Sequence, residues 1–75
     1  MQMERVRKII LAVRQAQRTG PGATPEALQA DGFRPDEISQ AVAEGHLSDY
    51  VTMGPALVYI LTPQAELLAY RLGWQ

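Results

Sequence analysis

The residues that could do acid–base or metal chemistry are few in this sequence, and they do not cluster. His46 is the single histidine, and the 75 residues include no cysteine. One histidine without a cluster of acids or thiols makes neither a catalytic triad nor a metal site, so we interpret His46 as structural or exposed. Asp36 and Glu37 are adjacent on a predicted helix, where their carboxylates point in different directions. The sequence therefore predicts no enzyme activity, no catalytic residue, no metal site, no cofactor and no small-molecule substrate.

Residues that could contact nucleic acid fall into two separate groups. In the first, Arg34 could reach phosphates, while Ser39 and Gln40 could read base edges from a predicted helix. The second group consists of arginines that lie within about 40° of one another on one flank of another predicted helix, namely Arg7, Arg14 and Arg18. Both groups are candidate DNA contacts. The arginine stripe could instead be a solvated polar flank, or it could pair with an acidic surface of a second copy.

The charge distribution argues against the first group as a DNA-reading surface. Residues 1–18 carry five basic residues and one acid, a net charge of +4, whereas residues 19–75 carry two basic residues and seven acids, a net charge of −5. After Arg34, the predicted helix around Ser39 and Gln40 holds only acidic charges. Affinity for DNA rests largely on cations at the phosphates, so a polyanion-binding surface would have to come mainly from the N-terminal segment.

A third set of side chains could form a protein interface, namely Leu11, Val58, Ile60 and Trp74. Leu11 falls away from the apolar face of its predicted helix. The strand Ala56–Leu61 is apolar on both faces, so either Val58 and Ile60 or Leu57 and Tyr59 should lie near the surface. An edge strand of this kind invites a partner strand. Trp74 follows the last predicted helix, where it could anchor a partner or fold back and close the core.

The elements that position these residues begin with an amphipathic helix. Its apolar face has the spacing of one side of a helix, and it consists of Val6, Ile9, Ile10 and Val13. Thr24-Pro25 and Thr62-Pro63 each place a capping hydroxyl before a proline at the first helical position. These signals predict helix two at 25–30 and helix four at 63–72. Helix three, at about 35–44, begins at Pro35 without a capping side chain, although Phe33 can pack on Ile38.

The buried faces of the later helices follow from the same spacing. Helix three is expected to bury Ile38, Ala41 and Val42. Helix four is expected to bury Leu68 and Leu72, together with Ala65 or Leu67.

Two strand-like runs at 47–53 and 56–61 follow helix three, and Gly54-Pro55 joins them as a hairpin. The order α-α-α-β-β-α, with a tight turn between helices two and three, predicts one α+β domain over residues 1–75. This is the winged helix-turn-helix arrangement, with a two-stranded antiparallel wing. A helical bundle without a hairpin is the alternative, but it requires a costly helix across Gly54 and Pro55.

The chain resembles a family of small winged-helix proteins typically carried by prophages. The resemblance rests on Met3–Leu11 (MERVRKIIL), Gly32–Ile38 (GFRPDEI), Ala43–Leu47 (AEGHL) and Tyr59–Leu68 (YILTPQAELL). It departs from many such regulators at Ala65, where they often have glycine, and in a shorter wing. The resemblance implies the fold and a phage or prophage setting for a viral protein. It implies no activity and no catalytic residue.

These observations favour a cytoplasmic winged-helix module that acts through protein contacts. The partner would be a second copy or a host or phage factor, because winged helices without a basic reading helix commonly bind proteins. The alternative is a DNA-binding transcriptional regulator that uses helix three and the wing, or the basic first helix. The lack of cysteine fits a reducing cytoplasm. No apolar run approaches the roughly 18 residues that span a bilayer, and the run at 9–13 is too short for a signal peptide, so no membrane partner is expected.

Overall fold

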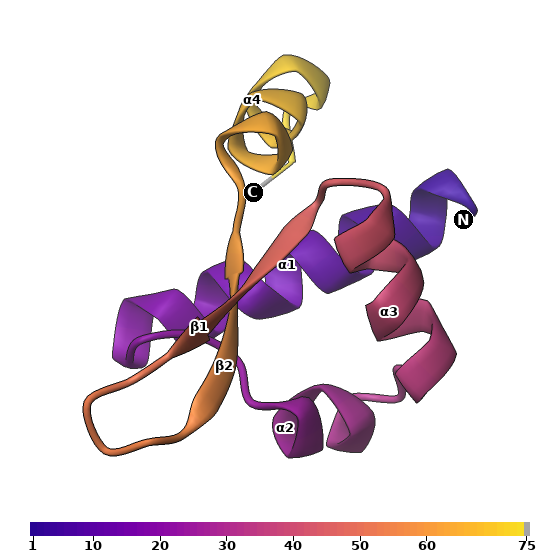
Figure 1. Cartoon of the computed structure of the whole chain (residues 1–75). Coiled ribbons are helices and arrows are strands. Elements are labelled where there is room, and N and C mark those ends of the chain that lie inside the picture. Colours follow the sequence, from indigo (N-terminus) through magenta and orange to yellow (C-terminus); the bar gives the residue numbers. More distant parts are fainter. Residues whose placement is uncertain (75) are drawn as a thin grey trace.

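The computed structural model describes residues 1–74, and the predicted order of four helices and a hairpin is confirmed (Figure 1). The elements are α1 (Met3–Thr19), α2 (Pro25–Ala30), α3 (Pro35–Ala43), β1 (Leu47–Val51), β2 (Leu57–Leu61) and α4 (Pro63–Leu72). In this view α1 passes behind the root of the hairpin. Helix α2 lies below α1, α3 lies to the right, and α4 lies at the top. Among the described residues, no helix has the length and apolarity needed to cross a membrane.

Local capping sets the helix boundaries. The Thr24 hydroxyl accepts a hydrogen bond from the Ala27 N–H, and the Thr62 hydroxyl accepts one from the Ala65 N–H, each at 3.1 Å. These bonds satisfy N–H groups that a helix start leaves without a partner. As a result, α2 and α4 have the predicted bounds. Helix α3 ends at Ala43, one residue earlier than expected.

The two strands pair antiparallel, with Leu47 opposite Leu61 and Val51 opposite Leu57. Both are shorter than predicted, because the hairpin closes at residue 52. There the Thr52 N–H donates to the Ala56 carbonyl at 3.0 Å, and the Thr52 hydroxyl accepts from the Ala56 N–H. Gly54 and Pro55 therefore lie in a loop rather than at strand ends.

A third extended segment meets the far edge of β2. Ala23 and Tyr59 exchange two backbone hydrogen bonds, of 3.0 and 2.7 Å, so the linker between α1 and α2 is fixed to the sheet. A side chain at Gly22 would stand 2.5 Å from the Tyr59 carbonyl oxygen. This close approach of two backbones explains why glycine occupies position 22.

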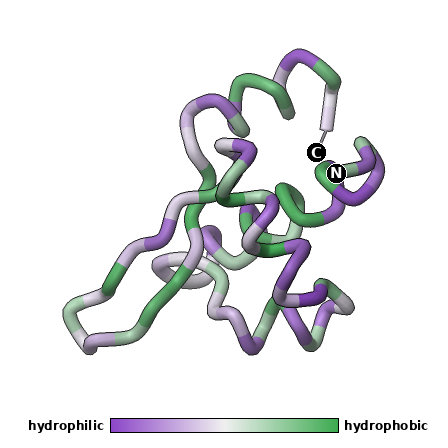
Figure 2. The backbone as a smooth tube through the Cα atoms, turned by 45° about the vertical axis from the view of Figure 1, so that its right-hand side comes forward, coloured by the Kyte–Doolittle hydropathy of each residue, from purple (hydrophilic) through white to green (hydrophobic). Residues whose placement is uncertain are grey.

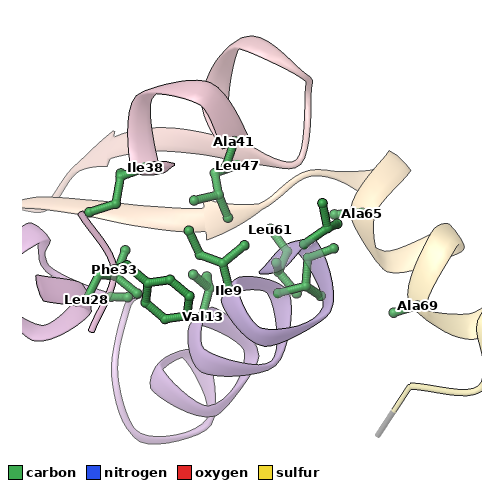
Figure 3. Packing of buried hydrophobic residues seen from close by; sticks show 13 residues of the cluster. Ile9, Val13, Leu28, Phe33, Ile38, Ala41, Leu47, Leu61, Ala65 and Ala69 are labelled. Carbon is green, nitrogen blue, oxygen red and sulfur yellow. The ribbon is translucent and has the colours of Figure 1, made fainter. Parts of the chain in front are cut away.

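The apolar side chains of all six elements form one core (Figure 3). The predicted face of α1 is fully buried, and Phe33 and Ile38 both join the cluster, as a hydrophobic staple requires. Helix α3 buries Ile38 and Ala41, while Val42 is only half-buried.

The prediction for α4 was wrong at Leu72, which is about half exposed. Of the two alternatives Ala65 and Leu67, Ala65 is the buried residue, and the core side of α4 consists of Ala65 and Ala69, with Leu68 half-buried. Two alanines allow the helix backbone to approach closely, so larger side chains are turned outward.

Candidate functional site

The acids at the start of α3 are bound within the fold. The Arg5 guanidinium donates from Nε to Glu37 Oε2 at 2.7 Å and from a terminal nitrogen to Glu37 Oε1 at 2.9 Å. The same guanidinium lies 4.9 Å from the centre of the Phe33 ring and donates to the Gly32 carbonyl. Arg5 on α1 therefore clamps both the turn before α3 and its first helical residues.

Glu37 has a second partner in the Arg34 N–H, which donates to its Oε1 at 3.1 Å. The hydrogen bond from Arg5, followed by that from Arg34, lowers the pKa of Glu37 from 4.5 to about 2. Glu37 thus supplies the cap that the Arg34 side chain cannot provide. Its role is structural, because its carboxylate is fully engaged by groups of the same chain.

The remaining charges at the start of α3 also pair with each other. Arg34 donates to Asp36 at 3.0 Å, and both side chains are mostly exposed. Ser39 and Gln40 are exposed further along the helix. The structure thus places Arg34 at the N-cap of α3 and Ser39 and Gln40 within the helix, but the Arg34 guanidinium already has the Asp36 carboxylate beside it.

The basic stripe of α1 lies on the opposite side of that helix from Arg5. With 100° per residue, Arg5 is about 140–180° from Arg7, Arg14 and Arg18, so the stripe faces away from α3. Arg7 pairs with Glu4 at 3.4 Å, and Arg14 donates to the Trp74 carbonyl at 3.0 Å. A shallow hollow of about 170 Å³ adjoins the stripe and is lined by Leu11, Arg14, Gln15 and Arg18. The two groups of candidate DNA contacts therefore do not form one surface.

Trp74 returns to the body of the protein because of the turn that ends α4. Gly73 adopts a left-handed conformation (φ 69°), and the Trp74 N–H donates to the Ala69 carbonyl at 2.9 Å, as in a Schellman motif. Trp74 is half-buried against the core cluster. This placement agrees with the interpretation that it closes the core.

His46 follows α3 and lies beside a second hollow. Its Nε2 is 3.5 Å from Glu44, whose other oxygen accepts from the Met1 ammonium at 3.1 Å. The bond from the ammonium is the main cause that lowers the pKa of Glu44. The hollow, of about 320 Å³, is lined by Glu44, Gly45, His46, Gln64, Leu67, Leu68 and Arg71. Across residues 1–74, no group of three or more acids, histidines or cysteines is placed to hold a metal ion.

The hairpin carries the most exposed apolar surface, and it projects away from the helices (Figure 2). Met53 is fully exposed, Val51 is 65% exposed, and Tyr50 and Leu57 are each more than 40% exposed. The prediction that Val58 lies in an exposed interface was wrong. Its side chain is only 2% exposed, because it packs against the linker at Gly22. Ile60 is half-buried. Sequence reasoning placed the exposed apolar surface on β2, whereas most of it lies on β1 and the loop.

Comparison of the chain with protein-family models, with curated proteins and with solved structures gives no match.

Proposed function

We propose that the chain is a winged-helix domain of phage or prophage type that acts in the cytoplasm through protein contacts. In this proposal α2 and α3 are the helix-turn-helix pair, and residues 47–61 are the wing. The element order supports it, as does the turn in which the Phe33 N–H donates to the Leu28 carbonyl. The short Ala23 segment beside β2 provides a third strand position.

The observation that carries the choice of protein over DNA is the pairing of charge around α3. Glu37 is held by Arg5, and Arg34 is held by Asp36, so the exposed side of this helix offers no unpaired cation within residues 1–74. The projecting hairpin offers exposed apolar side chains and only one charge, Asp49. A surface of this kind suits a protein partner better than a phosphate backbone.

A DNA-binding regulator is the second candidate. Ser39 and Gln40 favour it, because they are adjacent and exposed on the helix that would enter the major groove, and both can bond to base edges. The arginine stripe of α1 could add contacts to phosphates, but it faces away from α3.

The two candidates differ in how binding depends on salt. We expect fluorescence anisotropy with duplex DNA to show only weak binding, no tighter than about 10⁻⁵ M at physiological salt. Any residual binding at low salt should fall in Arg18→Ala and be unchanged in Gln40→Ala. Binding that is much tighter than this and is lost in Gln40→Ala would establish the regulator instead.

The proposal that the chain binds a protein is tested with substitutions in the hairpin. Val51→Ser and Met53→Ser remove exposed apolar side chains without touching the core, so the fold should be unchanged by circular dichroism. We expect these two variants to lose binding to the protein partner, whether that partner is a second copy or another protein. Gln40→Ala, the matched variant on α3, should keep this binding. Association that is equal in all three variants would contradict the assignment of the hairpin.

A further inference from the structure

The outer edge of β1 has backbone groups without partners. Thr52 bonds to Ala56 across the hairpin, so the even-numbered residues of β1 point their amides inward, towards β2. The amides of Asp49 and Val51 therefore point outward. Consistent with this, Tyr59, which stands opposite Asp49, directs its own amide and carbonyl away from β1, to Ala23. Among residues 1–74, no backbone hydrogen bond outside the hairpin involves Asp49 or Val51.

This edge lacks several of the usual protections against strand pairing. Sheet edges are commonly blocked by charged side chains, above all lysine, by proline, by a bulge, by a covering segment or by being very short. β1 has the sequence LSDYV, with one acid and neither lysine nor proline, and its register with β2 is regular. The hairpin also projects from the body, and none of the helices within residues 1–74 lies over its tip (Figure 1).

We propose that a second copy of this chain pairs with the edge, β1 against β1 in antiparallel orientation, with Tyr50 on the two-fold axis. The result is a four-stranded sheet with the order β2, β1, the partner's β1 and the partner's β2. This inference rests on the proposed function, since it names the partner of the protein contact.

The sequence of β1 is complementary to itself in this one register. With Tyr50 on the axis, Asp49 of each copy stands opposite Val51 of the other. In each of these two pairs, the outward N–H of each residue donates to the outward carbonyl of the residue opposite, which gives four hydrogen bonds. Ser48 stands opposite the partner's Thr52, so a hydroxyl faces a hydroxyl. The two tyrosines lie side by side as a non-hydrogen-bonded pair, in which cross-strand aromatic contacts are stabilising.

The neighbouring two-fold registers are less favourable. An axis at Asp49 places two carboxylates directly opposite each other, where like charges repel. An axis at Val51 moves Asp49 opposite the partner's Met53, which lies in the loop, so fewer strand residues overlap. Charge and strand length thus select the register centred on Tyr50.

Pairing along so short a strand buries less than the roughly 1,200 Å² of a standard stable complex. The dimer is therefore weak and concentration-dependent. For this reason, the first test traps it covalently.

The native chain has no cysteine, so a single substitution introduces a single thiol. Two residues that stand directly opposite each other as a non-hydrogen-bonded pair have Cα atoms about 4.5 Å apart. A disulfide can span this distance. In a glutathione buffer, Tyr50→Cys should form disulfide-linked dimer at a yield about tenfold above Tyr70→Cys. Tyr70 is the matched control, because it is an 85% exposed tyrosine on α4. Equal yields in the two variants would overturn the proposal.

A second test checks the register with charged substitutions. Dimerisation of each variant is measured by sedimentation, after circular dichroism has verified its fold. Val51→Lys places a cation opposite the partner's Asp49, whereas Val51→Asp places a second acid there. We expect the lysine variant to dimerise at least about tenfold more tightly than the aspartate variant at low salt, because the dimer contains two such pairs. Equal weakening of both variants would mean that a charge merely disrupts an apolar contact, and would exclude this register.

Failure of the proposed self-pairing can be distinguished from failure of the proposed function. If neither variant set supports self-pairing but another protein binds through the hairpin, only the present inference fails. If DNA binding that depends on Gln40 appears, the protein-contact function fails.

Discussion

At the scale of single residues, Glu37 shows how an acid on a predicted reading helix can serve the fold alone. Its carboxylate accepts from Arg5, 32 residues earlier, and from the Arg34 N–H. Both bonds favour the ionised form and hold its pKa at about 2. An acidic sequence over α3 therefore does not imply an acidic binding surface.

The lowered pKa makes the contribution of Glu37 depend on pH. In the unfolded chain the carboxyl titrates near its ordinary pKa of 4.5, whereas in the folded chain it titrates near 2. The folded state therefore binds fewer protons in this window, and the stabilisation is complete above pH 4.5 and is lost as pH falls towards 2. We expect Glu37→Gln to be less stable than wild type at pH 7. In urea unfolding, the difference should shrink as pH is lowered from 4.5 to 2, and a difference that does not change with pH would contradict this role.

At the scale of elements, the hairpin is fixed at its root and free at its tip. The root is held on one side by the Ala23–Tyr59 bridge and on the other by the core contacts of Leu47. Its outer half projects beyond the helices in Figure 1, and the apolar side chains of Val51, Met53 and Leu57 there are exposed. The close approach of Gly22 to β2 is the point on which this anchoring depends.

Gly22→Ala tests that anchoring. The added methyl group would stand 2.5 Å from the Tyr59 carbonyl oxygen and 3.1 Å from side-chain carbons of Val58 and Ile60, so the linker must move away from the sheet. We expect a loss of about 1–3 kcal/mol in the free energy of unfolding, measured by urea titration. Gly54→Ala is the control, because nothing lies within 4 Å of its added methyl group. Its unfolding free energy should stay within about 1 kcal/mol of wild type, and a similar loss in both variants would contradict the steric explanation.

Most of the elements could be predicted from sequence, because their signals are local. Thr24 and Thr62 each stand beside a proline and three residues before the N–H that they cap, so the helix starts are visible in short windows. The faces of α4 could not be predicted in this way. A pattern of leucines indicates an apolar face, but the distance between α1 and α4 decides whether leucine or alanine fits there, and that distance is a tertiary property.

The candidate site was less predictable for the same reason. The pairing of Arg5 with Glu37 joins residues far apart in the chain, and no local signal marks it. The outward amides of β1 depend on the register of the hairpin, which the sequence suggests only loosely at Gly54-Pro55. The element order, which capping, periodicity and turn signals predicted, is confirmed, but those signals mark no site residue.

At the scale of the whole molecule, one core holds together a domain that is small enough to be sensitive to single changes. Domains of this size bury only about 60% of the surface of the unfolded chain. Ile9 lies near the centre of the cluster and is fully buried (Figure 3). A cavity at this position therefore affects every element that packs on α1.

Ile9→Ala should cost about 2–5 kcal/mol, a large part of the total stability of a small domain. We expect the melting temperature measured by calorimetry to fall by at least about 10 °C. Tyr70→Ala, on the exposed side of α4, should leave the unfolding free energy within about 0.5 kcal/mol of wild type. Comparable losses in the two variants would mean that α4 contributes to the core through its outer face.

The two alanines through which α4 packs on the core also indicate which positions of this helix can change in sequence. Ala65 and Ala69 make the buried contact, so the outer positions Leu67, Tyr70 and Leu72 contribute little to it. Their side chains can be exchanged without repacking the interior, which leaves this face open to rapid sequence change. The same freedom makes it the natural place to attach a fluorophore or an affinity tag, on the side of the molecule away from the tip of the hairpin.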